Sequence, residues 1–298
     1  MTQFGKIVTA MITPFDERGD VDEREAARIA AWLFSRGNTA LVVAGSTGEG
    51  QTLTAHERER LFAAVKEAAG ARTVVANAGS NDTRDSVRSV TAAQRAGADA
   101  ILAVVPYYNK PAQSGMLAHF GAIAQATDLP VIIYNIPGRT AANMLPETLF
   151  ELARRHANIA GVKESSGDLM QIGTVLAGRD QGFLVFAGDD HLFLPCLAMG
   201  ADGVVGVASH LCSLEYAAMI RAHESGDAPE AARIHLSLLP LIRTLFAATN
   251  PIGVKWAMRQ LGFAAGECRL PLDAIPGDVS GALRPMLQRY RDAAHSGV

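Results

Sequence analysis

The sequence predicts an α/β protein built around a (β/α)8 TIM barrel with a C-terminal helical appendage. Short runs of β-branched residues alternate eight times with longer amphipathic segments, and eight such units are the number that closes this barrel. Most runs are apolar at both odd and even positions, as expected for parallel strands with both faces covered. A doubly wound open sheet alternates similarly, but eight units within about 220 residues favour closure.

The eight predicted strands are short and regularly spaced. Helix signals lie between them: Thr54 and Glu57 have the spacing of a capping box, and Pro146 stands where a first helical turn tolerates proline. A helix is therefore expected after each strand. In chain order, the predicted strands are Ile7–Thr13, Ala40–Ala44, Thr73–Asn77, Ala100–Val104, Val131–Asn135, Ile159–Lys163, Phe183–Ala187 and Gly203–Gly206.

Beyond the eighth unit the pattern is only helical. It covers residues 229–295, with breaks at residues 250–251 and 262–276. No linker or low-complexity segment separates this part from the barrel. We therefore expect a catalytic barrel over residues 1–226 and a helical region over residues 227–298 that packs on it.

The composition narrows the function classes. Hydrophobic residues make up 49% of the 298 residues, which is enough for a large core. A formal net charge of −3 argues against binding nucleic acid or anionic membranes by bulk electrostatics. Three cysteines without CxxC spacing exclude a disulfide framework and a thiolate zinc cluster. With neither a signal-peptide pattern nor an apolar run of roughly 18 residues, a soluble cytoplasmic protein is expected.

Polar residues follow five of the predicted strands at the point where each strand ends. Active sites of this fold lie at the carboxyl ends of the strands. We therefore expect these segments to converge on one rim of the barrel. They are Gly45–Gly50, Pro106–Asn109, Tyr134–Thr140, Lys163–Ser166 and Gly188–Asp190.

Lysine is the most informative residue type at this rim. Only Lys163 ends a predicted strand, and alternation with Gly161 points its side chain into the barrel. Lys66 and Lys110 are expected on solvated surfaces, and Lys255 on a helix with its amine in water. A lysine paired with a carboxylate for stability is the alternative reading of Lys163. Because lysine is rarely buried without a partner or a task, the position favours a functional role.

A buried amine suits Schiff-base chemistry. Desolvation disfavours the ammonium form and leaves the nitrogen lone pair free to attack a carbonyl. The reaction also needs a proton shuttle, and Tyr134 is the best candidate because it ends the preceding strand, about 4.8 Å away. A tyrosine at a strand end is otherwise a packing residue with a satisfied hydroxyl.

Other rim residues suggest ligands for carboxylates rather than metals. The segment Gly45–Gly48 offers hydroxyl and backbone N–H groups that form a cradle for a carboxylate, although a glycine-rich turn alone is a weak signal. Arg139 is suited to a bidentate grip on a second carboxylate, with an exposed surface arginine as the alternative. Asp189 and Asp190 have no histidine or glutamate nearby at ligand spacing, so a helix N-cap is expected there. No metal site is predicted.

These motifs resemble the dihydrodipicolinate synthase and N-acetylneuraminate lyase family of pyruvate-dependent class I aldolases. The resemblance covers nearly the whole chain and rests on several ordered motifs at matching spacing. They are Gly45-Ser46-Thr47-Gly48-Glu49, Pro106-Tyr107-Tyr108-Asn109, Tyr134-Asn135-Ile136-Pro137 with Arg139-Thr140, Gly161-Val162-Lys163-Glu164, Gly188-Asp189-Asp190, Gly203-Val204-Val205 and Asn250-Pro251-Ile252 with Val254-Lys255-Trp256.

The resemblance implies roles for individual residues. Lys163 is the lysine that forms the imine with pyruvate, and Tyr134 is the catalytic acid and base. Ser46 and Tyr108 complete a hydroxyl relay with Tyr134, and Tyr108 enters from a neighbouring subunit. Ser46 stands where the synthase often has threonine, so the hydroxyl is kept. The implied substrate-binding residues are Thr47, Val205, Arg139 and Gly188.

The implied reaction condenses pyruvate with L-aspartate 4-semialdehyde to 4-hydroxytetrahydrodipicolinate, in lysine and diaminopimelate biosynthesis. Arg139 would hold the carboxylate of the semialdehyde. No cofactor is implied, because the protonated imine is the electron sink, and a homotetramer built from dimers is expected. Feedback inhibition by lysine is doubtful, because Ala55 and Arg58 stand where sensitive relatives have histidines.

Three alternatives are weighed against this function. A paralogous aldolase or dehydratase would act on a sugar acid or a hydroxyproline-derived acid, which Arg139 argues against. A non-catalytic pyruvate-binding barrel would not need the full set of hydroxyls around Lys163. A flavin or phosphate barrel would carry a glycine-rich loop after the last strands, where Asp189 and Asp190 would repel phosphate.

Overall fold

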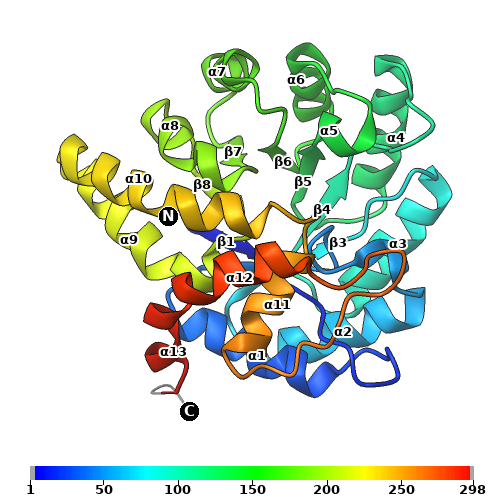
Figure 1. Ribbon diagram of the computed structural model, residues 1–298. Helices are drawn as coiled ribbons and strands as arrows, with labels where there is room; N and C mark the ends of the chain where they lie inside the picture. The colour runs from blue at the N-terminus through cyan, green and yellow to red at the C-terminus, as the bar shows by residue number, and fades with distance from the viewer. Residues whose placement is uncertain (1–3, 296–298) are drawn as a thin grey trace.

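The computed structural model describes residues 4–295 and forms a closed barrel of eight parallel strands. Each strand pairs with the next one along the chain, and the eighth pairs with the first (Figure 1). This confirms the predicted fold class. The strands are β1 (Ile7–Ala10), β2 (Ala40–Val43), β3 (Thr73–Asn77), β4 (Ala100–Val104), β5 (Val131–Asn135), β6 (Ile159–Glu164), β7 (Leu184–Ala187) and β8 (Gly203–Gly206).

Four strand boundaries differ from the prediction: β2 ends one residue earlier and β6 one residue later, and hydrogen bonds outside the ladder explain the other two. The strand β1 ends at Ala10 rather than Thr13, because the backbone N–H of Ile12 donates to Nε2 of His210 at 3.2 Å and leaves the ladder. The strand β7 begins at Leu184, because the N–H of Phe183 is used in a turn with the carbonyl of Asp180. In β1 and β7 the apolar run in the sequence is therefore longer than the strand, by three residues and by one residue.

Helices surround the barrel, as Figure 1 shows. The predicted capping box is present, since the Thr54 hydroxyl accepts from the Glu57 N–H and the Glu57 carboxylate accepts from the Thr54 N–H. The helices of the barrel are α1 (Glu23–Ser35), α2 (Ala55–Ala69), α3 (Thr83–Arg95), α4 (Gln113–Gln125), α5 (Pro137–Thr140), α6 (Pro146–Arg155), α7 (Leu169–Gly178), α8 (Phe193–Ala198) and α9 (Ser209–Glu224), with 3-10 turns at Gly50–Thr52 and Asp190–Leu192.

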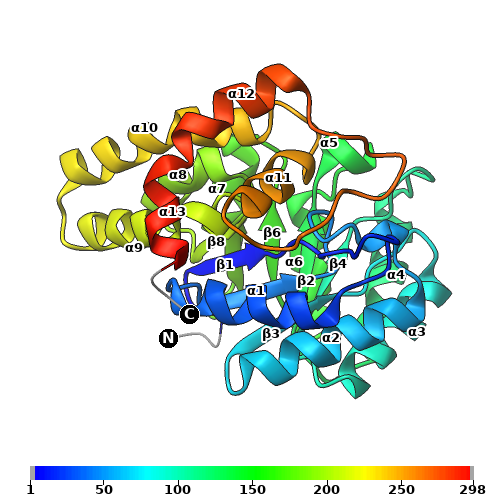
Figure 2. The same cartoon turned by 60° about the horizontal axis from the view of Figure 1, so that its bottom comes forward.

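The C-terminal part is helical, as predicted, and its helices lie together beside the barrel (Figure 2). The side chain of Asp227 caps the first of them by accepting from the Glu230 N–H at 3.1 Å. The domain boundary at residue 226 stays a prediction. The helices are α10 (Ala228–Leu245), α11 (Ile252–Gln260), α12 (Gly277–Met286) and α13 (Gln288–His295).

The interior of the barrel is packed with inward-facing side chains that include Ile132, Tyr134, Leu184 and Phe186. On β6, Gly161 occupies the inward-facing position two residues before Lys163, opposite Ile132 on β5. A Cβ at Gly161 would lie 2.5 Å from the backbone oxygen of Leu184, so only glycine allows β6 and β7 to approach as they do. Among residues 4–295, no helix is long and apolar enough to cross a membrane.

Candidate active site

Lys163 and Tyr134 lie side by side inside the barrel. They are direct partners in the ladder between β5 and β6, and both are buried. The Nζ atom of Lys163 lies 4.0 Å from the centre of the Tyr134 ring. Within the part of the chain that the structure describes, Nζ forms no hydrogen bond or ion pair. The inward direction predicted for both side chains is confirmed, and the amine is not paired with a carboxylate.

Two adjacent carboxylates follow β7 near this amine. Burial raises the pKa of Asp189, and the positive charge of Lys163 opposes that rise. Asp190 is fully buried, which raises its pKa, and its oxygens accept from the N–H groups of Val207 and Ala208 at 2.9 and 3.2 Å and from the Tyr216 hydroxyl at 2.8 Å.

The predicted helix N-cap is present in position only, since Asp189 is the N-cap residue of the 3-10 turn at Asp190–Leu192. The side chain of Asp189 makes no cap hydrogen bond. Asp190 instead fixes the backbone that follows β8, directly after the predicted substrate contact Val205. A Cβ at Gly206 would lie 2.3 Å from Oδ1 of Asp190, so the segment and the carboxylate fit together closely. The sequence did not reveal this because the partners are 17 and more residues away.

The segment Gly45–Gly50 forms a tightly wound loop at the end of β2. Ala44 and Glu49 both have left-handed backbone angles, with φ of 56° and 51°. A Cβ at Gly50 would lie 1.9 Å from the carbonyl oxygen of Ala44, which requires glycine. Thr47 is buried, and its hydroxyl accepts a hydrogen bond from the Asn250 amide at 2.9 Å. The loop is thus a fixed turn rather than a flexible one.

A cavity of about 390 Å³ opens beside this loop at the carboxyl rim. It brings together Ser46 and Arg139, which lie on different strand ends, and the backbone carbonyl of Asn250 accepts from Arg139 at 3.2 Å. Lys163 and Tyr134 do not line this cavity. Other residues that line it are Gln51, Arg58, Asn77, Ser80, Asp85, Tyr107 and Thr140.

Three further predicted site residues lie at the same rim in different settings. The N–H of Gly188 donates to the carbonyl of Glu164 at 2.8 Å, which places Gly188 next to the end of β6. Val205 is buried and pairs with β1. Tyr108 is 88% exposed with φ of 73°, so a single chain does not bring its hydroxyl to Tyr134.

Sequence reasoning missed a buried polar cluster behind Lys163. Glu164 points to the outer face of β6, where burial raises its pKa and hydrogen bonds oppose the rise. Its oxygens accept from the Asn135 amide at 3.1 Å and from the Ser166 N–H at 2.8 Å. The side chains of Asn143 and Gln171 extend the cluster. The sequence did contain one indication of this cluster, because Glu164 directly follows Lys163 at the end of an otherwise apolar strand.

Two lysines differ from the predictions. Lys255 is 1% exposed rather than solvated, and its Nζ donates to Oε1 of Glu49 at 2.6 Å. Lys66 forms an ion pair with Asp99 at 2.7 Å rather than pointing freely into water. In both cases the partner carboxylate is remote in sequence. For metals, residues 4–295 hold no group of three His, Cys, Asp or Glu residues that could bind an ion.

Comparisons with known proteins agree with this geometry. A family model described as the Dihydrodipicolinate synthetase family matches residues 3–289. A relative from Thermosynechococcus vestitus, named 4-hydroxy-tetrahydrodipicolinate synthase, is 47% identical over 289 residues, which are 96% of this chain and 97% of the relative. A relative of the same name from Bacillus subtilis is 46% identical over 92% of this chain and 95% of its own.

A solved structure described as DHDPS from Cyanidioschyzon merolae with lysine bound superposes with a TM-score of 0.94. It is 43% identical and covers 99% of each chain. The similarity therefore extends over nearly the full length of the chain and over the whole barrel. The chain belongs to the dihydrodipicolinate synthetase family.

Proposed function

We propose that this chain is a lyase that condenses pyruvate with L-aspartate 4-semialdehyde to give 4-hydroxytetrahydrodipicolinate. The name of the full-length relatives supports this activity rather than that of a sugar-acid aldolase or a non-catalytic barrel. The observation that carries the proposal is the buried Lys163 amine, which no described residue pairs with and which lies against the Tyr134 ring.

The reaction begins at the Lys163 nitrogen. Its lone pair attacks the keto carbon of pyruvate, and Tyr134 supplies the proton that the carbonyl oxygen takes up. Loss of one water gives the protonated imine, which withdraws electrons from the neighbouring methyl group. Loss of a methyl proton then gives the enamine.

The enamine carbon attacks the aldehyde carbon of the second substrate. A carbon–carbon bond forms, and the aldehyde oxygen becomes a hydroxyl by taking a proton from the relay of Ser46, Tyr108 and Tyr134. The product's own amine then attacks the imine carbon and displaces Lys163, which closes the ring and regenerates the free amine. One water is released in total, and no redox step occurs.

The remaining residues are proposed to bind the carboxylates of the two substrates. Thr47 and the backbone of Val205 bind the pyruvate carboxylate, and Gly188 leaves room beside it. Arg139 binds the carboxylate of the semialdehyde from the rim cavity. No metal or organic cofactor takes part in this scheme, since the protonated imine stabilises the carbanion.

The exposure of Tyr108 supports an oligomeric enzyme. Its hydroxyl can join the relay only if it reaches a neighbouring active site, because its own chain leaves it 88% exposed. We therefore propose a homotetramer built from dimers, acting in the cytoplasm in lysine and diaminopimelate biosynthesis.

The decisive assay offers pyruvate together with either aspartate semialdehyde or a set of sugar acids. Turnover with the semialdehyde, at a kcat/KM at least ten-fold above that with any sugar acid, is expected. Turnover confined to sugar acids would assign the chain to a paralogous activity. Pyruvate binding without any turnover would assign it to a binding protein.

A further inference from the structure

The carboxylate of Glu49 ends the Gly45–Gly50 loop and is held by the C-terminal region. Glu49 is 2% exposed. Its Oε1 accepts from Nζ of Lys255 on α11 at 2.6 Å, and its Oε2 accepts from the backbone N–H of Arg269 at 2.8 Å. Both partners are more than 200 residues away in sequence. The loop that follows β2 is therefore tied to two separate segments of the C-terminal region.

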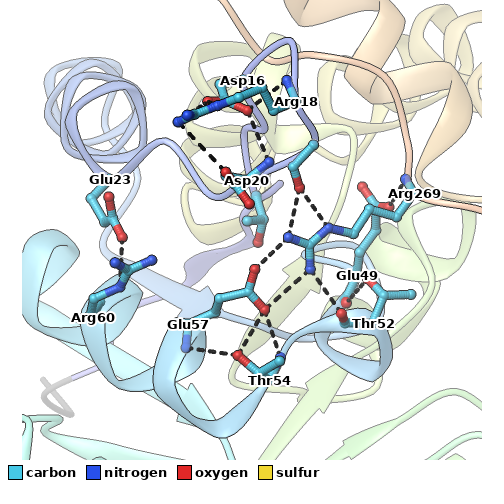
Figure 3. Close-up of polar contacts among 12 residues, drawn as sticks. Asp16, Arg18, Asp20, Glu23, Glu49, Thr52, Thr54, Glu57, Arg60 and Arg269 are labelled. Carbon is cyan, nitrogen blue, oxygen red and sulfur yellow. Dashed lines mark hydrogen bonds and ion pairs between the residues drawn. The ribbon is translucent and has the colours of Figure 1, made fainter.

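The side chain of Arg269 extends the same attachment (Figure 3). Its guanidinium donates to the carbonyl of Gly19 at 2.9 and 2.7 Å and to the carbonyl of Thr52 at 2.8 Å. It also forms an ion pair with Glu57 in the first turn of α2. One side chain thus joins the segment before α1, the turn after the loop and the start of α2.

The charges in this cluster balance. Nζ of Lys255 lies 3.9 Å from the centre of the Phe15 ring, and the Arg269 guanidinium lies 4.3 Å from it, so one buried ring contacts both cations. The two carboxylates are Glu49 and Glu57. Burial raises the pKa of the nearby Cys268 thiol to about 12, so that thiol stays neutral. Two cations face two carboxylates, and removing one leaves a buried charge without its partner.

The backbone conformation of the Gly45–Gly50 loop is unfavourable without these contacts. Glu49 has a left-handed φ of 51°, which costs free energy for a residue with a side chain and persists only where surrounding contacts impose it. Thr47 lies two residues before Glu49 and is held from the same C-terminal region by Asn250. Both sides of the loop therefore depend on contacts outside the barrel strands.

We propose that Lys255 and Arg269 are positioning residues for the pyruvate-binding loop. Lys255 acts through the Glu49 carboxylate, and the Arg269 side chain acts through the Thr52 carbonyl in the turn that follows the loop and through Glu57 in α2. They touch neither substrate. They hold the loop so that the Thr47 hydroxyl and the adjacent N–H groups face the pyruvate carboxylate while Lys163 attacks the keto carbon. This inference rests on the proposed function, because it needs pyruvate as the ligand of this loop.

The test compares Arg269→Gln with the control Arg179→Gln. Arg179 is similarly part-buried, forms an ion pair with Asp202, and donates to the carbonyls of Phe183 and Gly200 at 3.1 and 3.0 Å. Phe183 and Asp202 directly precede β7 and β8, so this arginine serves the amino end of the barrel. Both variants lose an ion pair and carbonyl contacts, but only Arg269→Gln disturbs the loop.

We expect Arg269→Gln to raise the KM for pyruvate by about ten-fold or more and to slow borohydride trapping of pyruvate in proportion. Its KM for the semialdehyde is expected within about two-fold of wild type, and Arg179→Gln should keep both wild-type KM values. Arg269→Lys, which keeps the charge, should recover part of the pyruvate affinity. Thermal unfolding of each variant separates this effect from loss of fold.

An unchanged pyruvate KM in Arg269→Gln, or an equal rise for both substrates, would overturn the inference. So would the same pyruvate effect in Arg179→Gln. If Arg269→Gln does not fold, Glu49→Gln tests the Lys255 contact instead, since its amide oxygen still accepts from the Arg269 N–H while the charge paired with Lys255 is lost. Wild type that traps no pyruvate overturns the proposed function and this inference together, whereas active wild type with unaffected variants overturns this inference alone.

Discussion

The Nζ atom of Lys163 lies 4.0 Å from the centre of the Tyr134 ring, and the two residues are paired across adjacent strands of the barrel. The proposed proton transfer uses the phenolic oxygen attached to that ring. Strand pairing rather than a loop sets this geometry. The side chains proposed as nucleophile and acid are therefore in place before substrate binds.

The substitution Tyr134→Phe tests the proton transfer. It keeps the buried ring and so the packing inside the barrel, but it removes the hydroxyl. We expect kcat to fall by about 10²–10⁴-fold, the usual range for losing a general acid or base, with slower trapping of the pyruvate imine. Steady-state kinetics measure the first effect, and timed borohydride quenching the second. Tyr290→Phe, on a buried ring in α13, should leave both unchanged. A Tyr134→Phe enzyme with wild-type kcat would exclude Tyr134 as the acid and base.

Arg139→Ala tests how the second substrate is recognised. Arg139 is exposed in this chain, so its pair with the substrate is desolvated only when the semialdehyde covers it. Truncating one partner of such a pair typically costs about 2–5 kcal/mol, which we expect mainly in the KM for aspartate semialdehyde. The KM for pyruvate should change little, because Thr47 rather than Arg139 is the proposed ligand of that carboxylate. Arg154→Ala, at an exposed position on α6, is the control and should change neither constant. Equal effects of Arg139→Ala on both substrates would remove Arg139 from this role.

Gly161→Ala tests the close approach of β6 and β7 beneath Lys163. The new Cβ would lie 2.5 Å from the Leu184 carbonyl oxygen, and a backbone atom in a ladder has little room to move. We expect a loss of about 1–3 kcal/mol in the free energy of unfolding, measured by urea denaturation. Gly173→Ala is the matched control, since it lies in α7 with no atom within 4 Å of the added Cβ. It should stabilise by about 0.4–1 kcal/mol. A neutral Gly161→Ala would show that the strands can separate without cost.

The ion pair between Glu57 and Arg269 predicts a specific pH dependence. The Arg269 side chain lowers the pKa of Glu57 from 4.5 to about 2. The folded state therefore favours the carboxylate, and its contribution is present above pH 4.5 and is lost as the pH falls toward 2. Glu57→Gln should cost about 1–3 kcal/mol at pH 7, and the difference from wild type should shrink below pH 4.5.

Urea denaturation between pH 3 and pH 7 measures this difference. Glu59→Gln, an exposed neighbour on α2, is the control for replacing a glutamate in this helix and should change the free energy of unfolding less than Glu57→Gln at pH 7. A constant difference between wild type and Glu57→Gln across the range would contradict the coupling to Arg269.

The parts of the fold that the sequence predicts well depend on local patterning. Four of the eight strands have the expected bounds, and the cap at Thr54 is present, because apolar runs and caps involve residues close in the chain. The inward direction of Lys163 was also predictable, since alternation along a strand is a geometric rule. The end of β1 was not predictable, because the N–H of Ile12 donates to His210, which lies 198 residues away in the sequence.

Long-range polar partners account for the other errors. The solvated amine predicted for Lys255 is wrong, because Glu49 lies 206 residues away and offers a buried carboxylate that no local pattern reveals. A helix N-cap was predicted at Asp189 and Asp190, but the Asp190 side chain binds N–H groups after β8 and the Tyr216 hydroxyl. Charge and spacing along the chain do not encode which buried groups meet when the barrel closes.

The most direct test of the account is the site of the imine. The enzyme is incubated with pyruvate, reduced with borohydride, digested and mapped by mass spectrometry, with Lys163→Ala as the control. Two lysines are buried, but Glu49 occupies the amine of Lys255 while the amine of Lys163 has no such partner among the described residues. We therefore expect the reduced pyruvate adduct on Lys163 alone and on no residue of the variant. An adduct on Lys255, or no adduct in an enzyme that turns over pyruvate, would contradict the account.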